Sequence, residues 1–192
     1  GIISEILPPG SFSDPTGSVR VIDGAGLITC PGFIDMHAHS DLQILLHPKH
    51  PAKITQGVTT EVLGQDGLSY APVDDPTLAA MREKLAGWNQ NPANLEYSWR
   101  TVGEYLDRLD AGVAVNTAYL LPQGTIRALA MGLGPGEPTP EQLSHQVKLV
   151  ADGMEQGAVG MSSGLTYTPG IYANDAELAA VCTTVAAHGG YY

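Results

Sequence analysis

The pattern of apolar and polar positions changes close to residue 31. Before that point, short apolar runs at residues 2–6, 19–22 and 27–30 are separated by loops rich in Pro, Gly, Ser and Asp. This pattern predicts three short strands and no helix. After it, strand-like apolar runs alternate with segments of helical period. We therefore divide the chain into residues 1–31 and residues 32–192.

The second part alternates strands with helices four times and then begins a fifth unit at its end. Strands are predicted within residues 31–41 and at residues 58–63, 113–121 and 158–162. Helices are predicted at residues 51–56, 77–87, 102–109, 125–131, 140–156 and 175–188. Such alternation implies a parallel sheet. An eight-stranded barrel needs about 250 residues, so the chain would hold half of one. An open, doubly wound sheet has the same alternation.

The segment 31–41 carries the first candidate chemistry, the sequence His-Ala-His. Side chains two residues apart in an extended chain share a face, so His37 and His39 are predicted to project together. Two neutral imidazoles on one face are typical of a zinc site, although such a pair also arises by chance. Asp66 follows the next predicted strand. Its carboxylate would complete or bridge a metal site, or would stabilise a Gln-Asp-Gly turn.

Polar side chains also follow the fourth predicted strand. The segment Gly160–Gly170 runs from the strand end into a loop that contains hydroxyl groups. In it, Tyr167 would donate a hydrogen bond to a carbonyl oxygen on which negative charge develops, or would pack on the rim as an amphipathic ring. Both barrels and open sheets place functional residues just past the carboxyl ends of strands, where His37, His39 and this loop all lie.

The other ionisable residues near these segments are given structural roles. Asp35 shares the face of His37 and is predicted to orient a ligand imidazole. Asp41 is predicted to cap a helix or turn. His188 is predicted to end the last helix, where a cation suits the helix dipole. Three further histidines are predicted to be solvated: His47, His50 and His145.

Composition narrows the class of protein. The chain has 192 residues, of which 43% are hydrophobic and 15% charged, which is typical of a globular protein. A net charge of −11 with only 9 Lys and Arg argues against binding nucleic acid or an anionic membrane. Cys30 and Cys182 have no metal-binding spacing and suit a reducing cytoplasm, so we predict a cytoplasmic location. No apolar run is long enough to span a bilayer.

Four segments together resemble a known family. They are PGFIDMHAHSD (residues 31–41), QGVTTEV (56–62), GQDGLSYAP (64–72) and GAVGMSSGL (157–165). The first resembles the opening barrel strand of the amidohydrolase superfamily, and the set resembles the N-acyl-D-amino-acid deacylases, or D-aminoacylases. The resemblance implies an α/β fold, the first half of a metal-dependent (β/α)8 TIM barrel. Residues 1–31 would form part of a small β-sandwich, and residues 32–192 four βα units and the start of a fifth strand.

The resemblance also implies an activity and its residues. Such enzymes use Zn2+ to hydrolyse the amide of an N-acyl-D-amino acid, a small-molecule substrate. His37 and His39 match metal ligands, and Asp66 stands where the family usually has a cysteine, which would alter metal affinity or preference. Tyr167 matches a tyrosine that hydrogen-bonds the scissile carbonyl, and we assign Ser163 to substrate binding beside it.

Part of the implied machinery lies outside the sequence. The resemblance puts two later metal histidines and the general-base aspartate beyond Tyr192, so no catalytic residue is assigned within the chain. We expect residues 1–192 alone to be inactive and to bind zinc weakly. The remainder of the barrel or a partner chain would cover the open half-barrel. A cyclic-amide hydrolase and an inactive barrel that serves as a binding module are the alternatives. The absence of a lysine beside Ser162 and Ser163 favours the deacylase.

Overall fold

The structure is a computed structural model that describes residues 2–192, which divide into two units between Pro31 and Gly32. Residues 2–31 contain turns, and no helix or strand is formed within them. Apolar side chains such as Ile2 and Ile28 are exposed there. The three strands predicted for this unit are therefore wrong in this structure, since a short strand needs a hydrogen-bonded neighbour and a covered apolar face. The β-sandwich assignment stays a prediction.

Residues 32–192 are built on four parallel strands whose order in the sheet is their order in the chain. The strands are β1 (Phe33–Asp35), β2 (Val58–Leu63), β3 (Asn116–Pro122) and β4 (Gly160–Ser162). Tyr191 forms a parallel bridge with Gly160, at the place predicted for a fifth strand. Sequential parallel strands linked by helices form a curled sheet, the arrangement that the sequence predicts for the first half of a barrel.

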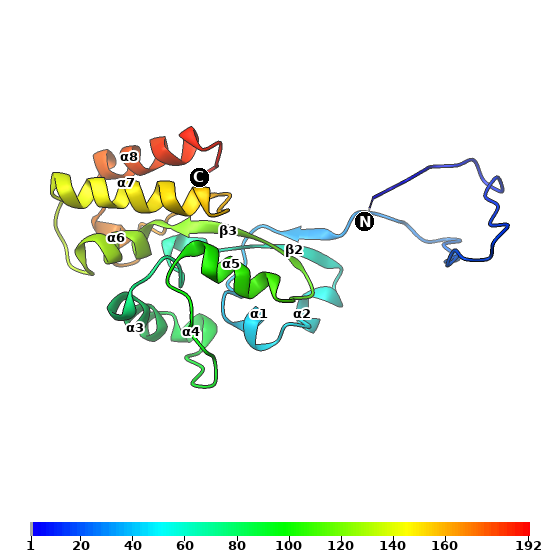
Figure 1. Cartoon of the computed structure of the whole chain (residues 1–192), viewed down its shortest axis with the longest axis horizontal. Helices are drawn as coiled ribbons and strands as arrows, with labels where there is room; N and C mark the ends of the chain where they lie inside the picture. The colour runs from blue at the N-terminus through cyan, green and yellow to red at the C-terminus, as the bar shows by residue number, and fades with distance from the viewer. Residues whose placement is uncertain (1) are drawn as a thin grey trace. The chain divides into compact units, whose positions relative to one another are not determined.

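Six of the helices lie in the predicted helical segments, whereas α1 is an additional short helix and α4 extends past the segment predicted at residues 77–87. They are α1 (Gln43–Leu46), α2 (Pro51–Ile54), α3 (Asp75–Lys84), α4 (Ala86–Asn89), α5 (Val102–Asp110), α6 (Gln123–Met131), α7 (Pro140–Glu155) and α8 (Asp175–Ala187), with 3-10 turns η1 (Gln65–Gly67) and η2 (Gly170–Tyr172). Helix α7 begins at a capping box formed by Thr139 and Gln142. It packs along α8 (Figure 1). Among the described residues, no helix is both long and apolar enough to cross a membrane.

Aromatic side chains form a row within the core. Trp99, Tyr105 and Tyr119 lie in a row, with ring centroids 5.4 and 5.1 Å apart, and all three are buried. Buried Tyr and Trp residues need a partner for the polar end of the ring. The Tyr105 hydroxyl donates to the backbone oxygen of Asp41 at 2.8 Å. The core is thereby attached to the segment that follows β1.

Candidate metal centre

The residues that follow β1 bring two imidazoles together. The chain bends after Asp35, and His37 and His39 leave the bend so that their Nε2 atoms lie 3.2 Å apart. Their rings are 5.0 Å apart between centroids and nearly perpendicular. The His37 side chain is 59% exposed and that of His39 27%. We refer to residues 37–39 as the ligand segment. Its two imidazoles converge as the sequence predicts.

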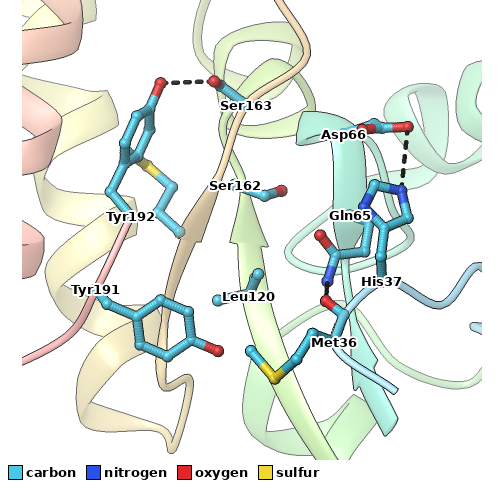
Figure 2. Close-up of a pocket in the computed structure, with 10 residues that line it drawn as sticks. Met36, His37, Gln65, Asp66, Leu120, Ser162, Ser163, Tyr191 and Tyr192 are labelled. Atoms are coloured by element: carbon cyan, nitrogen blue, oxygen red, sulfur yellow. Dashed lines mark hydrogen bonds and ion pairs between the residues drawn. The ribbon is translucent and has the colours of Figure 1, made fainter. Parts of the chain in front are cut away.

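Asp66 reaches the same place from η1, the turn that follows β2. Its backbone is left-handed, with φ 55° and ψ 24°, a conformation that Asp adopts more readily than most residues. Its Oδ2 atom lies 3.3 Å from Nε2 of His39. It also lies 3.7 Å from Nε2 of His37, and Figure 2 shows this second pair. Ligand atoms of the three side chains all lie within 4.8 Å of one another. The structure thus brings the three predicted metal ligands together, and metal binding itself stays a prediction.

The end of β4 holds the Asp66 turn. The Ser162 hydroxyl donates to the backbone oxygen of Gly64 at 2.5 Å and accepts from the backbone N–H of Gly67 at 2.9 Å. A Cβ atom on Gly164 would lie only 2.1 Å from the backbone oxygen of Asp66, so this position requires glycine. Ser162 is a positioning residue that the sequence does not identify, because its two partners lie more than ninety residues away.

A pocket of about 380 Å³ lies beside these residues at the carboxyl ends of the strands. Figure 2 shows His37 and Asp66 on one side of it and Ser163 and Tyr192 on the other. The hydroxyls of Ser163 and Tyr192 are 2.5 Å apart. The rest of the lining consists of Met36, Gln65, Leu120, Met161, Ser162 and Tyr191. Ser163 therefore lies on the opposite wall from the candidate ligands, and its substrate-binding role stays a prediction.

Tyr167 is connected to the candidate ligand His39 by Trp88, a residue that the sequence does not identify. Trp88, in the short helix α4, lies on the His39 ring with a centroid distance of 4.3 Å. The Trp88 and Tyr167 rings are 5.6 Å apart and meet edge to face. The Lys84 ammonium donates to the Thr168 hydroxyl at 2.6 Å, which ties α3 to the Tyr167 loop. Trp88 directly follows the helix predicted at residues 77–87, and no motif in the sequence marks it as part of a site.

Two carboxylates make contacts that differ from those the sequence predicts. Asp35 accepts the backbone N–H of His37 at 3.1 Å and pairs with Lys53, so it contacts the ligand segment through the backbone and not through a ring. Asp41 caps neither a helix nor a turn of its own. It is buried and accepts from the N–H of Gly64 and from the Ser69 hydroxyl. Burial raises the pKa of Asp41, and the hydrogen bond from Ser69 opposes this.

The predicted environment is also wrong for one histidine. His50 is buried, and its Nε2 atom lies 3.0 Å from Oε2 of Glu61. A neighbouring buried carboxylate compensates for the loss of water around the imidazole. His47 and His145 are exposed as predicted, and His188 lies at the end of α8 as predicted.

Comparison with known proteins identifies similar sequences and folds. Residues 20–191 match the Amidohydrolase family. The D-aminoacylase of Alcaligenes xylosoxydans xylosoxydans is 36% identical over 184 residues, which cover 95% of this chain and 37% of that protein. A crystal structure of D-aminoacylase, described as defining a novel subset of amidohydrolases, gives a TM-score of 0.70 at 33% identity, over 83% of this chain and 33% of that one.

A further solved structure is that of N-acyl-D-glutamate deacylase from Bordetella bronchiseptica, complexed with zinc and a phosphonate inhibitor. It gives a TM-score of 0.69 at 32% identity and covers 82% of this chain and 32% of that chain. The chain thus spans about a third of the length of the proteins it matches. The matches confirm the predicted fold of residues 32–192, the first half of a TIM barrel of the amidohydrolase type.

Proposed function

The chain belongs to the amidohydrolase family, and from that premise we propose that it is the amino-terminal part of a metal-dependent hydrolase. Its substrate is an N-acyl-D-amino acid, whose linear amide is cleaved to a carboxylate and a free D-amino acid. Similarity to D-aminoacylase and to N-acyl-D-glutamate deacylase supports this substrate class. The observation that carries the proposal is the convergence of His37, His39 and Asp66 at one end of the sheet.

The three side chains fit a divalent metal ion. Zinc bonds to nitrogen and oxygen are about 2.0–2.2 Å long, so tetrahedral ligand atoms lie about 3.3–3.6 Å apart. The corresponding separations among His37, His39 and Asp66 are 3.2, 3.3 and 3.7 Å. Imidazole and carboxylate are also donors that zinc accepts. We assign Zn2+, because the similar N-acyl-D-glutamate deacylase is complexed with zinc.

Each residue of the centre then has a role. A metal ion held there supplies a Lewis acid that polarises the scissile carbonyl. Tyr167 donates a hydrogen bond to the carbonyl oxygen as negative charge develops. Ser163 binds the substrate from the opposite wall, and Trp88 shields the outer side of His39 from solvent. We assign the general base to an aspartate beyond Tyr192, as the family resemblance implies.

The assignment of Asp66 as a ligand is tested by two substitutions in the full-length protein. Asp66→Ala removes a donor and is expected to lower zinc affinity at least about tenfold. Asp66→Cys supplies a softer thiolate and is expected to raise affinity for zinc relative to manganese. Isothermal titration with each metal measures both effects, and Asp152→Ala, on the exposed face of α7, is the control. Parent-like zinc affinity in Asp66→Ala would exclude the ligand role.

The reaction is tested with the zinc-loaded full-length protein against a panel of N-acetyl-D-amino acids, their L-forms and hydantoins. Only the D-forms are expected to be hydrolysed, and treatment with a chelator is expected to abolish turnover. Hydrolysis of hydantoins alone would favour a cyclic-amide hydrolase. If the protein shows no turnover and binds no metal, an inactive binding module would be favoured. Residues 1–192 expressed alone are expected to show no turnover.

The remaining parts of the proposal concern partners and location. Ile34 and Met36 are 59% and 57% exposed beside the free edge of β1, and we propose that the remainder of the barrel or a partner chain covers them. The acidic net charge supports neither nucleic acid nor an anionic membrane as a partner. Cys30 and Cys182 are free thiols, which supports a cytoplasmic location.

A further inference from the structure

A cluster of charged side chains lies behind the ligand segment, outside the pocket. At its centre is Glu61 of β2, whose side chain is completely buried. Lys53 of α2 places its ammonium 2.7 Å from Oε1 of Glu61 and 2.5 Å from Oδ2 of Asp35. His50 lies 3.0 Å from the other oxygen of Glu61. The Lys53–Glu61 pair thus connects α2 to β2 and to the end of β1.

Both flanks of the ligand segment are attached to this ion pair. On the side before the segment, Asp35 accepts the backbone N–H of His37 through Oδ1 and the Lys53 ammonium through Oδ2. On the side after it, the Ser40 hydroxyl donates to Oε1 of Glu61 at 3.3 Å, the oxygen that Lys53 also contacts. The two ends of a short loop are therefore linked through one ion pair.

The ligand segment needs such support because β1 alone gives little. β1 has three residues, and its pairing with β2 is irregular between Phe33 and Ile34. The His37 side chain is largely exposed, so packing does not fix it. A mobile ligand must be ordered when a metal binds, and this costs affinity.

We propose that the Lys53–Glu61 ion pair is a positioning clamp that holds the two flanks of the ligand segment, so that His37 and His39 present their imidazoles together to a divalent metal ion. This inference rests on the proposed function, and it assigns positioning roles to residues that do not contact the metal. Asp35 and Ser40 are the two links between the clamp and the segment.

The charges of the cluster suit this role. The hydrogen bond from Lys53 lowers the pKa of Asp35. Burial lowers the pKa of Lys53, but its contacts with Asp35 and Glu61 outweigh burial and raise it. The ammonium therefore stays charged beside Asp35 and Glu61.

The test compares the binding of Co2+ by the parent and variant full-length proteins. A titration measures the affinity, and the visible spectrum of bound Co2+ reports the geometry of its ligands. Lys53→Met keeps the length of the side chain and removes the charge. It is expected to weaken Co2+ binding about 10–100-fold and to change the spectrum. Lys53→Arg restores the charge and is expected to recover most of the affinity. Lys148→Met, which breaks an exposed pair with Asp152 on α7, is the matched control and should bind like the parent.

Two milder variants decide the question even if Lys53→Met does not fold. Asp35→Asn and Ser40→Ala each cut one link and leave the Lys53–Glu61 pair intact, and each is expected to weaken Co2+ binding several-fold. Parent-like affinity and spectrum in both would overturn the clamp while leaving the metal centre in place. A parent protein that binds no Co2+ would overturn the metal centre and the clamp together.

Discussion

Two buried glutamates of this chain are paired with cationic side chains, and the two pairs differ in the segments that they connect. Glu61 meets Lys53 and His50 beside the ligand segment, and the Lys53 side chain remains 23% exposed. Glu177 of α8 meets Arg127 of α6, and neither side chain is exposed at all. Arg127 also donates to the backbone oxygen of Gly136. The first pair joins a candidate ligand segment to its support, and the second joins helices and a loop to one another.

The difference separates stability from function. A buried ion pair is expensive to desolvate, so its presence is weak evidence for stability, but removal of one partner leaves a charge without compensation. In the Arg127–Glu177 pair, which is fully buried, removal of the cation should lower the free energy of unfolding. In the pair beside the ligand segment, His50 remains as a second partner for Glu61, so the loss of Lys53 should appear mainly in the metal affinity.

Arg127→Met is expected to have the largest effect on stability. It leaves Glu177 buried, and the side-chain contact that remains to its carboxylate within residues 2–192 is the weak one from Gln123 at 3.5 Å. We expect a loss of about 3–5 kcal/mol in the free energy of unfolding, measured with urea. Metal affinity of the folded fraction should not change. The exposed-pair variant Lys148→Met should cost less than about 1 kcal/mol. If Arg127→Met kept its stability but lost metal affinity, the Arg127–Glu177 pair would support the metal centre and not the fold, which would contradict this prediction.

Ser162→Ala is expected to have an intermediate effect, which lowers both the free energy of unfolding and the metal affinity. It removes the hydroxyl that bonds Gly64 and Gly67, on either side of Asp66. We expect a loss of about 1–3 kcal/mol in unfolding free energy and weaker metal binding, since the carboxylate is no longer held. Ser163→Ala, one residue later, removes a hydroxyl that contacts Tyr192 instead and should leave metal affinity unchanged. Equal metal affinities in the two variants would show that Ser162 does not position Asp66.

The sequence predicts well those elements whose signals are local. β2 occupies the predicted residues 58–63, because a β-branched run lies between glycines. Helix α7 begins where Thr139 and Gln142 form a capping box. His37, His39 and Asp66 converge as the sequence predicts, because strand ends meet at one edge of a parallel sheet.

The sequence fails where a residue depends on distant partners. Asp41 looks like a cap, but its contacts are with Gly64 and Ser69, 23 and 28 residues later. The sequence predicts a solvated His50, because no residue near it in the chain indicates the contact with the buried Glu61. The strands predicted within residues 2–31 have suitable composition, but their pairing would need partners from elsewhere. Local pattern therefore decides element type, and long-range contacts decide burial and role.

Trp88→Phe is expected to have the smallest effect and to separate the two regions by spectroscopy. The chain has two tryptophans: Trp88 lies on His39 and is 37% exposed, whereas Trp99 is buried in the core. Metal binding at His39 should change the fluorescence of Trp88 only, and unfolding should change that of Trp99. Trp88→Phe keeps an aromatic ring and should cost no more than about 1 kcal/mol. In the full-length protein, it should reduce the metal-induced fluorescence change while the urea transition remains visible. A metal-induced change equal to that of the parent would mean that Trp88 does not report on the ion and that the ion binds away from His39.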